Sequence, residues 1–137
     1  MKTYIIKLIS LLLLVAASIF SVACTSVATK MTESGNLAEK SLNFIAANEA
    51  YLSALENNPK QEEARQGLNR TIKNSYDQQL ANIISLEKER RFLEANRALE
   101  NLERMILRAS VFIQMPFQTA DFKQRFQITN LHIQRGS

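Results

Sequence analysis

The sequence is poor in residues that interrupt helices and in residues that build catalytic or metal centres. Its 137 residues include no Trp, two Pro, three Gly, one Cys and one His. Because Gly and Pro are the strongest interrupters of regular structure, their scarcity favours long helices. A single Cys cannot form an internal disulfide, and a single His, here His132, is more often a surface residue than a metal ligand or a general base.

Motifs for catalysis and for cofactor binding are missing as well. The chain has no glycine-rich phosphate loop, no Cys/His cluster and no nucleophile motif. Glu62 and Glu63 stand at the expected start of a helix, where acidic side chains favour the helix dipole, so they predict a structural role. We therefore expect neither an enzyme nor a bound cofactor or metal.

One long apolar run lies near the start of the sequence. It extends over Leu8–Cys24, follows Lys2 and Lys7, and ends in Ser-Val-Ala-Cys. A positive start, an apolar middle and a small-residue cleavage site are the parts of a secretory signal. The uninterrupted run is shorter than the roughly 20 residues that span a bilayer, although an uncleaved anchor helix stays an alternative.

The end of this run resembles the lipobox of bacterial lipoproteins, Leu-(Ala/Ser)-(Gly/Ala)-Cys. Ala23 and Cys24 match that pattern, whereas Ser21 and Val22 depart from it. The resemblance implies that the Cys24 thiol takes a diacylglycerol, that the chain is cut before it and that the new amine is acylated. Residues 1–23 would then be a lipoprotein signal peptide, and two or three acyl chains would anchor the protein in membrane lipid.

Removing residues 1–23 would leave a chain with little net charge. The full sequence has 17 basic and 13 acidic residues; without Lys2 and Lys7 it has 15 basic residues, and the net charge falls from +4 to +2. Such a small surplus does not indicate nucleic-acid binding. Near the C-terminus several basic residues outnumber one acid and could meet anionic headgroups, although a solvated face explains them as well: Arg104, Arg108, Lys123, Arg125 and Arg135 against Asp121.

Residues 24–36 are small and polar without a period, and they predict a flexible tether between lipid and domain. They could also hold the first turns of a helix. By resemblance to the Gram-negative sorting pattern, Thr25 in place of Asp after the acylated Cys24 implies the outer membrane, facing the periplasm.

The following residues, 37–113, predict an all-α domain. Apolar residues recur at steps of three and four in three segments, Leu37–Asn57, Lys60–Arg90 and Phe92–Ala109. Asn58 and Pro59 mark the end of the first segment. No Gly or Pro marks the end of the second, so an unbroken helix from Lys60 to Ser110 stays an alternative.

The C-terminal segment, residues 114–137, predicts a short helix. Pro116 breaks the preceding pattern, and four later side chains share one helical face: Phe122, Phe126, Thr129 and Ile133. Residues 126–128 and 131–133 also alternate like short strands, but we favour the helix.

A heptapeptide occurs twice in the helical domain. Residues 44–50, FIAANEA, return 48 residues later as residues 92–98, FLEANRA. The first copy continues through Tyr51 and Ala54 to Pro59 and resembles the second helix of a tetratricopeptide repeat, including the Pro that starts the next repeat. Repeats of that family are roughly 34 residues long, and a helix lengthened by about four turns within Lys60–Arg90 would absorb the difference.

The two resemblances together imply a lipid-anchored helical interaction module, an adaptor or scaffold that binds another envelope protein. In tetratricopeptide families the concave face of the antiparallel hairpins binds a peptide or a partner helix. Asn48 and Asn96, which the repeat places equivalently, could clamp such a peptide or could pack where helices cross. The alternative is a structural spacer, another helical hairpin or a short coiled coil, without a peptide-binding groove.

Overall fold

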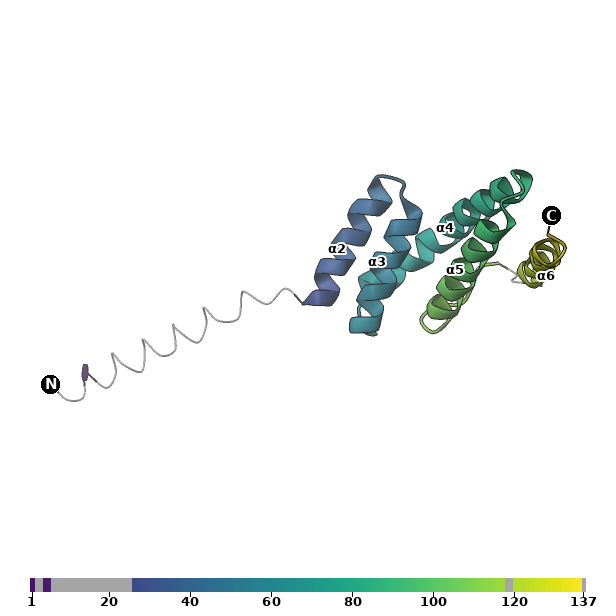
Figure 1. Cartoon of the computed structure of the whole chain (residues 1–137). Helices are drawn as coiled ribbons and strands as arrows, with labels where there is room; N and C mark the ends of the chain where they lie inside the picture. Colours follow the sequence, from purple (N-terminus) through teal and green to yellow (C-terminus); the bar gives the residue numbers. More distant parts are fainter. Residues whose placement is uncertain (2–3, 6–25, 118–119, 137) are drawn as a thin grey trace.

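The computed structural model describes residues 1, 4–5, 26–117 and 120–136, and within these ranges the chain is helical and has no strand. The helices are α2 (Val27–Lys40), α3 (Phe44–Asn57), α4 (Glu62–Lys88), α5 (Phe92–Ser110) and α6 (Ala120–Gln134). Figure 1 shows α2 to α5 as antiparallel neighbours, with α6 beyond α5. The predicted all-α fold of antiparallel hairpins is confirmed.

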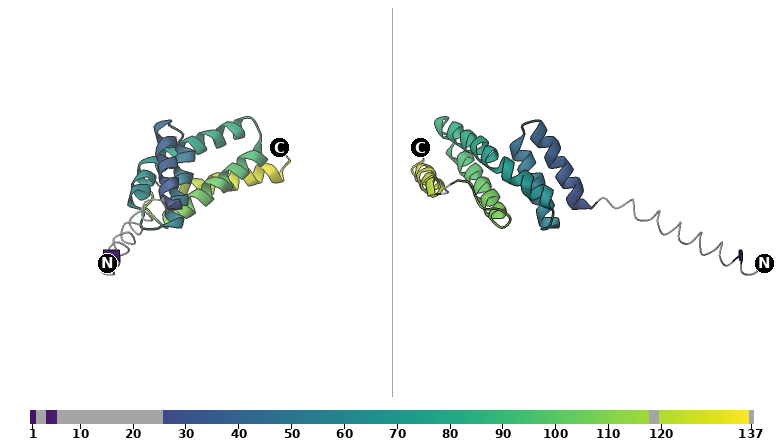
Figure 2. Two further views of the ribbon diagram at one scale, coloured as in Figure 1. Left: turned by 90° about the vertical axis from the view of Figure 1, so that its left-hand side faces the viewer. Right: turned by 180° about the vertical axis from the view of Figure 1, so that it is seen from behind.

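Each helix packs mainly on the helices next to it in the chain, and α2 also touches α4. Two turned views agree that α2 and α3 lie side by side and that α5 lies beside the far part of α4 (Figure 2). Packing between nearest neighbours is typical of repeat arrays.

In the described part of residues 24–36, which begins at Ser26, α2 takes the place of the expected flexible tether and agrees with the alternative that this segment holds the first turns of a helix. The Ser26 hydroxyl accepts a hydrogen bond from the Thr29 amide at 3.2 Å and caps a helix that continues to Lys40. The buried side of this helix consists of small residues, Ala28, Thr32 and Gly35. Because these side chains are small, the segment lacks the pattern of large apolar residues from which a helix is usually predicted.

The predicted helix Leu37–Asn57 is in fact the end of α2 and the whole of α3, joined by a turn. At Leu42 φ is 58°, and the amides of Leu42 and Asn43 donate to the carbonyls of Glu39 and Ala38 at 3.0 and 2.9 Å. These two bonds form a Schellman motif, whose left-handed residue is usually Gly. Since Leu occupies that position, the sequence carries no turn signal here.

The same turn recurs 48 residues later between α4 and α5. At Arg90 φ is 62°, and the amides of Arg90 and Arg91 donate to the carbonyls of Glu87 and Leu86 at 3.0 and 2.9 Å. The unbroken helix to Ser110 is therefore wrong. Each copy of the heptapeptide follows a matched turn and begins a helix, the first α3 and the second α5.

α4 has 27 residues, which agrees with the lengthened helix expected within Lys60–Arg90. At 1.5 Å per residue it is about 40 Å long, nearly twice the length of the 14-residue α3. α5 packs along the far part of α4. Phe117, in the loop that follows α5, stacks on Tyr76 of α4 with ring centroids 4.2 Å apart.

The helix expected near the C-terminus is present as α6.

Tyr51 of α3 lies completely buried between α2 and α4. A Cβ atom on Gly35 of α2 would come within 2.5 Å of the tyrosine ring, and a Cβ atom on Gly67 of α4 within 2.3 Å. Real Cβ atoms do not approach so closely, so both positions require glycine as long as the ring is present.

We therefore expect Gly67→Ala to destabilise the chain by about 1–3 kcal/mol, the range for overpacking, although the same change in an exposed helix would stabilise it. In a Tyr51→Leu background the added methyl group should cost much less, because the ring it would strike is gone. Urea denaturation followed by circular dichroism measures both effects. The control is Asn74→Ala on the exposed side of α4, and equal costs of Gly67→Ala in the two backgrounds would contradict the packing argument.

Candidate functional site

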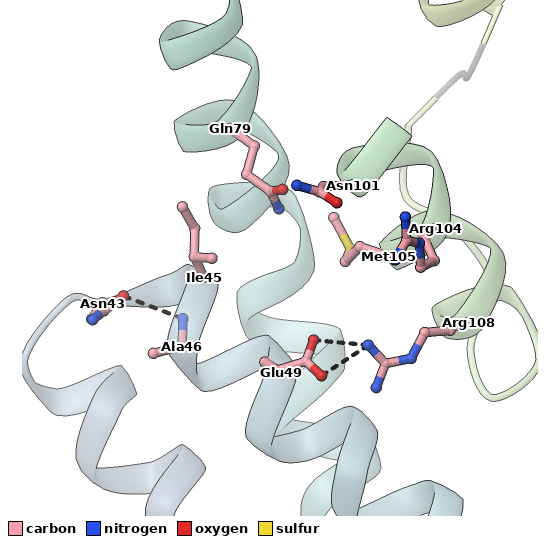
Figure 3. A pocket seen from close by; sticks show the side chains of 9 residues that line it. All are labelled: Asn43, Ile45, Ala46, Glu49, Gln79, Asn101, Arg104, Met105 and Arg108. Carbon is pink, nitrogen blue, oxygen red and sulfur yellow. Dashed lines mark hydrogen bonds and ion pairs between the residues drawn. The ribbon is translucent and has the colours of Figure 1, made fainter. Parts of the chain in front are cut away.

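A groove of about 740 Å³ lies between α3, α4 and α5 (Figure 3). It forms because α3 and α5 both pack on α4 but make few contacts with each other. Its lining comes from the start of α3, one residue of α4 and the second half of α5: Asn43, Ile45, Ala46, Glu49, Gln79, Asn101, Arg104, Met105 and Arg108. The volume is within the range of ligand pockets, roughly 300–1,000 Å³.

The groove combines apolar surface with hydrogen-bonding groups. Ile45, which is 44 % exposed, and Met105, which is 6 % exposed, provide the apolar part. In Figure 3 the side-chain amides of Gln79 and Asn101 approach each other from α4 and α5. An amide side chain can both donate and accept, as a peptide group does, so this lining suits an extended peptide better than an apolar small molecule.

Arg108 connects the two walls of the groove. Its guanidinium donates to Glu56 at 2.7 and 3.0 Å and to Glu49 at 2.9 and 2.8 Å, and thereby joins α5 to α3. The hydrogen bonds from Arg108 hold the pKa of Glu56 below its usual range, and those to Glu56 and Glu49 raise the pKa of Arg108. This cation fixes the width of the groove at a place where the two helices scarcely touch.

Replacing Arg108 by Gln should lower the free energy of unfolding by about 0.5–1 kcal/mol at neutral pH, as for other solvent-screened pairs. Because folding lowers the pKa of Glu56, the stabilisation is present above pH 4.5, the ordinary value, and is lost as the pH falls through the lowered pKa. Thermal melts of the original chain and of Arg108→Gln should therefore converge on acidification. Arg104→Gln is the matched control, since Arg104 makes no ion pair with any described residue, and a difference that persists at low pH would contradict the assignment.

The structure places Asn48 and Asn96 in different surroundings and not on a common binding face. Asn48 is only 1 % exposed; its carbonyl oxygen accepts a hydrogen bond from the Thr71 hydroxyl at 2.5 Å, and its amide lies 4.0 Å from the Met105 sulfur. Asn48 thus packs beneath the groove and cannot clamp a peptide, in agreement with the packing alternative.

Asn96 lies outside the groove. Its amide donates to Glu100 one turn later at 3.1 Å, and its carbonyl oxygen is buried without a hydrogen-bond partner in the described part of the chain. The repeat therefore predicts matched positions along two helices but not matched environments.

A second hollow, of about 390 Å³, lies between the end of α4, the start of α5 and α6. His132 of α6 stacks on Phe92 there, with ring centroids 4.5 Å apart. Arg125 of α6 forms an ion pair with Glu87 of α4, and the Thr129 hydroxyl donates to the same carboxylate at 3.1 Å. These contacts attach α6 to the array. The ion pair with Glu87 also neutralises Arg125, as Glu49 and Glu56 neutralise Arg108. Two of the basic residues that outnumber acids near the C-terminus are therefore paired.

The predicted signal peptide, residues 1–23, and Cys24 lie outside the described residues, apart from residues 1, 4 and 5. None of the described helices is long and apolar enough to cross a membrane. Within the same ranges, His, Cys, Asp and Glu side chains form no group of three or more that could hold a metal ion.

No protein-family model, no curated protein and no solved structure matches the chain. The groove could not be predicted from the sequence, because the residues that line it come from three helices and follow no motif along the chain.

Proposed function

We propose that the chain is a lipid-anchored adaptor of the bacterial cell envelope, and that the groove between α3, α4 and α5 receives an extended segment of another envelope protein. The observation that carries the proposal is the composition of this groove. The exposed Ile45 and the nearly buried Met105 lie beside the amides of Gln79 and Asn101, and Arg104 adds an exposed cation. Apolar pockets with a few polar groups that fix orientation are typical of specific binding sites.

The first hairpin supports the resemblance to tetratricopeptide repeats. The pattern of that family includes a Gly in the first helix, Ala-x3-aromatic in the second and a Pro after it. In this chain those features are Gly35 in α2, Ala47 and Tyr51 in α3, and Pro59 before α4. Proteins built from such hairpins characteristically bind other proteins through the surfaces that neighbouring hairpins form.

Cross-linking can test the groove directly. A photoreactive benzoylphenylalanine in place of Asn101 should give a discrete protein adduct in envelopes, and the same residue in place of Asn74, exposed on α4 outside the groove, should not. A charge in the apolar part of the groove, Ile45→Glu, should remove the adduct, because its carboxylate would lose hydration when a partner covers it. Circular dichroism should show that Ile45→Glu remains folded.

The same adduct at both positions, or an adduct that is still formed in Ile45→Glu, would refute the proposal that the groove is the binding site. A helical spacer without a partner predicts no adduct at either position, so the experiment separates the adaptor from the structural alternative.

The anchor depends on Cys24, whose surroundings resemble a lipobox. Cells grown with radioactive palmitate should label the original protein, and Cys24→Ala should abolish the label because it removes the acceptor thiol. The variant should also keep residues 1–23, since the cut in lipoproteins follows acylation. Equal labelling of both proteins would refute acylation of Cys24 and would leave the proposed binding site in the groove untested by this result.

A further inference from the structure

The start of α2 lies very close in sequence to the proposed lipid anchor. Ser26 caps the helix and Val27 is its first residue, so only Thr25 separates Cys24 from the cap. The Cα atoms of Cys24 and Ser26 can be no more than roughly 7 Å apart, because a chain extends at most about 3.3–3.6 Å per residue. Acyl chains on Cys24 would therefore hold the first turn of α2 at the headgroups.

The first turns of α2 expose side chains that suit the membrane interface. Val27 is 55 % exposed and Met31 is 37 % exposed, and residues four apart lie on the same side of a helix. Lys30 lies exposed beside them. Apolar side chains next to a lysine are typical of surfaces that enter the boundary between headgroups and acyl chains, because the lysine stem can lie along the apolar part while its ammonium group stays in water.

Other elements end at the same edge of the array. In Figure 1 the start of α2, the end of α3 and the end of α5 all point to the lower side. Val111, which directly follows α5, is 75 % exposed, and Lys60 is exposed in the turn after α3. The exposed acids in these turns are Glu33, Glu62 and Glu63, and they stand against the exposed Lys30 and Lys60, so the edge carries no large charge and apolar contact is its main means of binding lipid.

We propose that this edge, formed by the first turns of α2 with the ends of α3 and α5, lies on the bilayer surface. The inference rests on the proposed lipid anchor. α3 runs antiparallel to α2, so its first residues, which line the groove, are at the opposite end of the hairpin from Val27. The α3 part of the groove therefore lies away from the bilayer, where a partner can reach it, whereas Arg108 in the last turn of α5 lies near the membrane-facing edge.

Fluorescence quenching on vesicles tests this orientation. The acylated protein, from which residues 1–23 have been removed, is reconstituted into vesicles of phosphatidylethanolamine and phosphatidylglycerol. The vesicles contain a lipid with a nitroxide near the headgroup. Lys30→Cys and Lys40→Cys each offer one free thiol for a fluorophore, because acylation blocks Cys24. Both lysines are exposed on α2 and lie about 15 Å apart along its axis, farther than the 5–10 Å to which interfacial residues enter a bilayer.

A label at residue 30 should lose most of its fluorescence to the nitroxide, whereas a label at residue 40 should keep most of it. Equal quenching at both residues in protein that floats with the vesicles would overturn the membrane-facing edge and leave the anchor intact. Protein that does not float, with a label also on Cys24, would show that the anchor itself is wrong, and the membrane-facing edge would fall with it.

Discussion

The packing of Tyr51 between two glycines is the constraint on which the rest of the fold depends. Its ring touches α2 on one side and α4 on the other, and neither Gly35 nor Gly67 could carry a Cβ atom without displacing it. Helices approach one another as closely as the side chains between them permit. The ring therefore sets the spacing of α2, α3 and α4, and it makes the first hairpin and the long helix one packed unit.

The hydroxyl group of Tyr51 extends this constraint to the edge of the same three helices. It can donate to Asn36 at 2.7 Å or to Glu39 at 2.6 Å, and Arg70 of α4 donates two bonds of 3.0 Å to the Glu39 carboxylate. The bonds from Arg70 lower the pKa of Glu39, whereas burial and the neighbouring Glu39 raise the pKa of Tyr51. A neutral phenol beside an ionised carboxylate is thus the stable arrangement across the neutral range, and polar and apolar contacts hold the same crossing.

Periodicity predicts a helix where its buried side is made of large apolar residues, as in α4 and α5, and fails where that side is small. The first part of α2 was only an alternative to a flexible tether because the helix buries Ala, Thr and Gly, and the turn after it was missed because Leu42 adopts the left-handed conformation without glycine. The site was harder to predict for a different reason. The repeat relates Asn48 to Asn96 along the chain, but burial depends on which helix crosses above each residue, and only Asn48 has α4 and α5 packed against it.

The length of α4 is what allows a groove to exist in so small an array. If α4 were as short as α3, the turn after it would return α5 directly along α3, and the two helices would close on each other as neighbours do in regular repeats. The additional turns carry the start of α5 far beyond the end of the first hairpin, and α5 then returns obliquely along α4 (Figure 1). It meets α3 mainly through Arg108, whose long side chain spans the remaining distance to Glu49 and Glu56. The same insertion that disguises the repeat in the sequence therefore creates the surface through which we propose that the protein binds its partner.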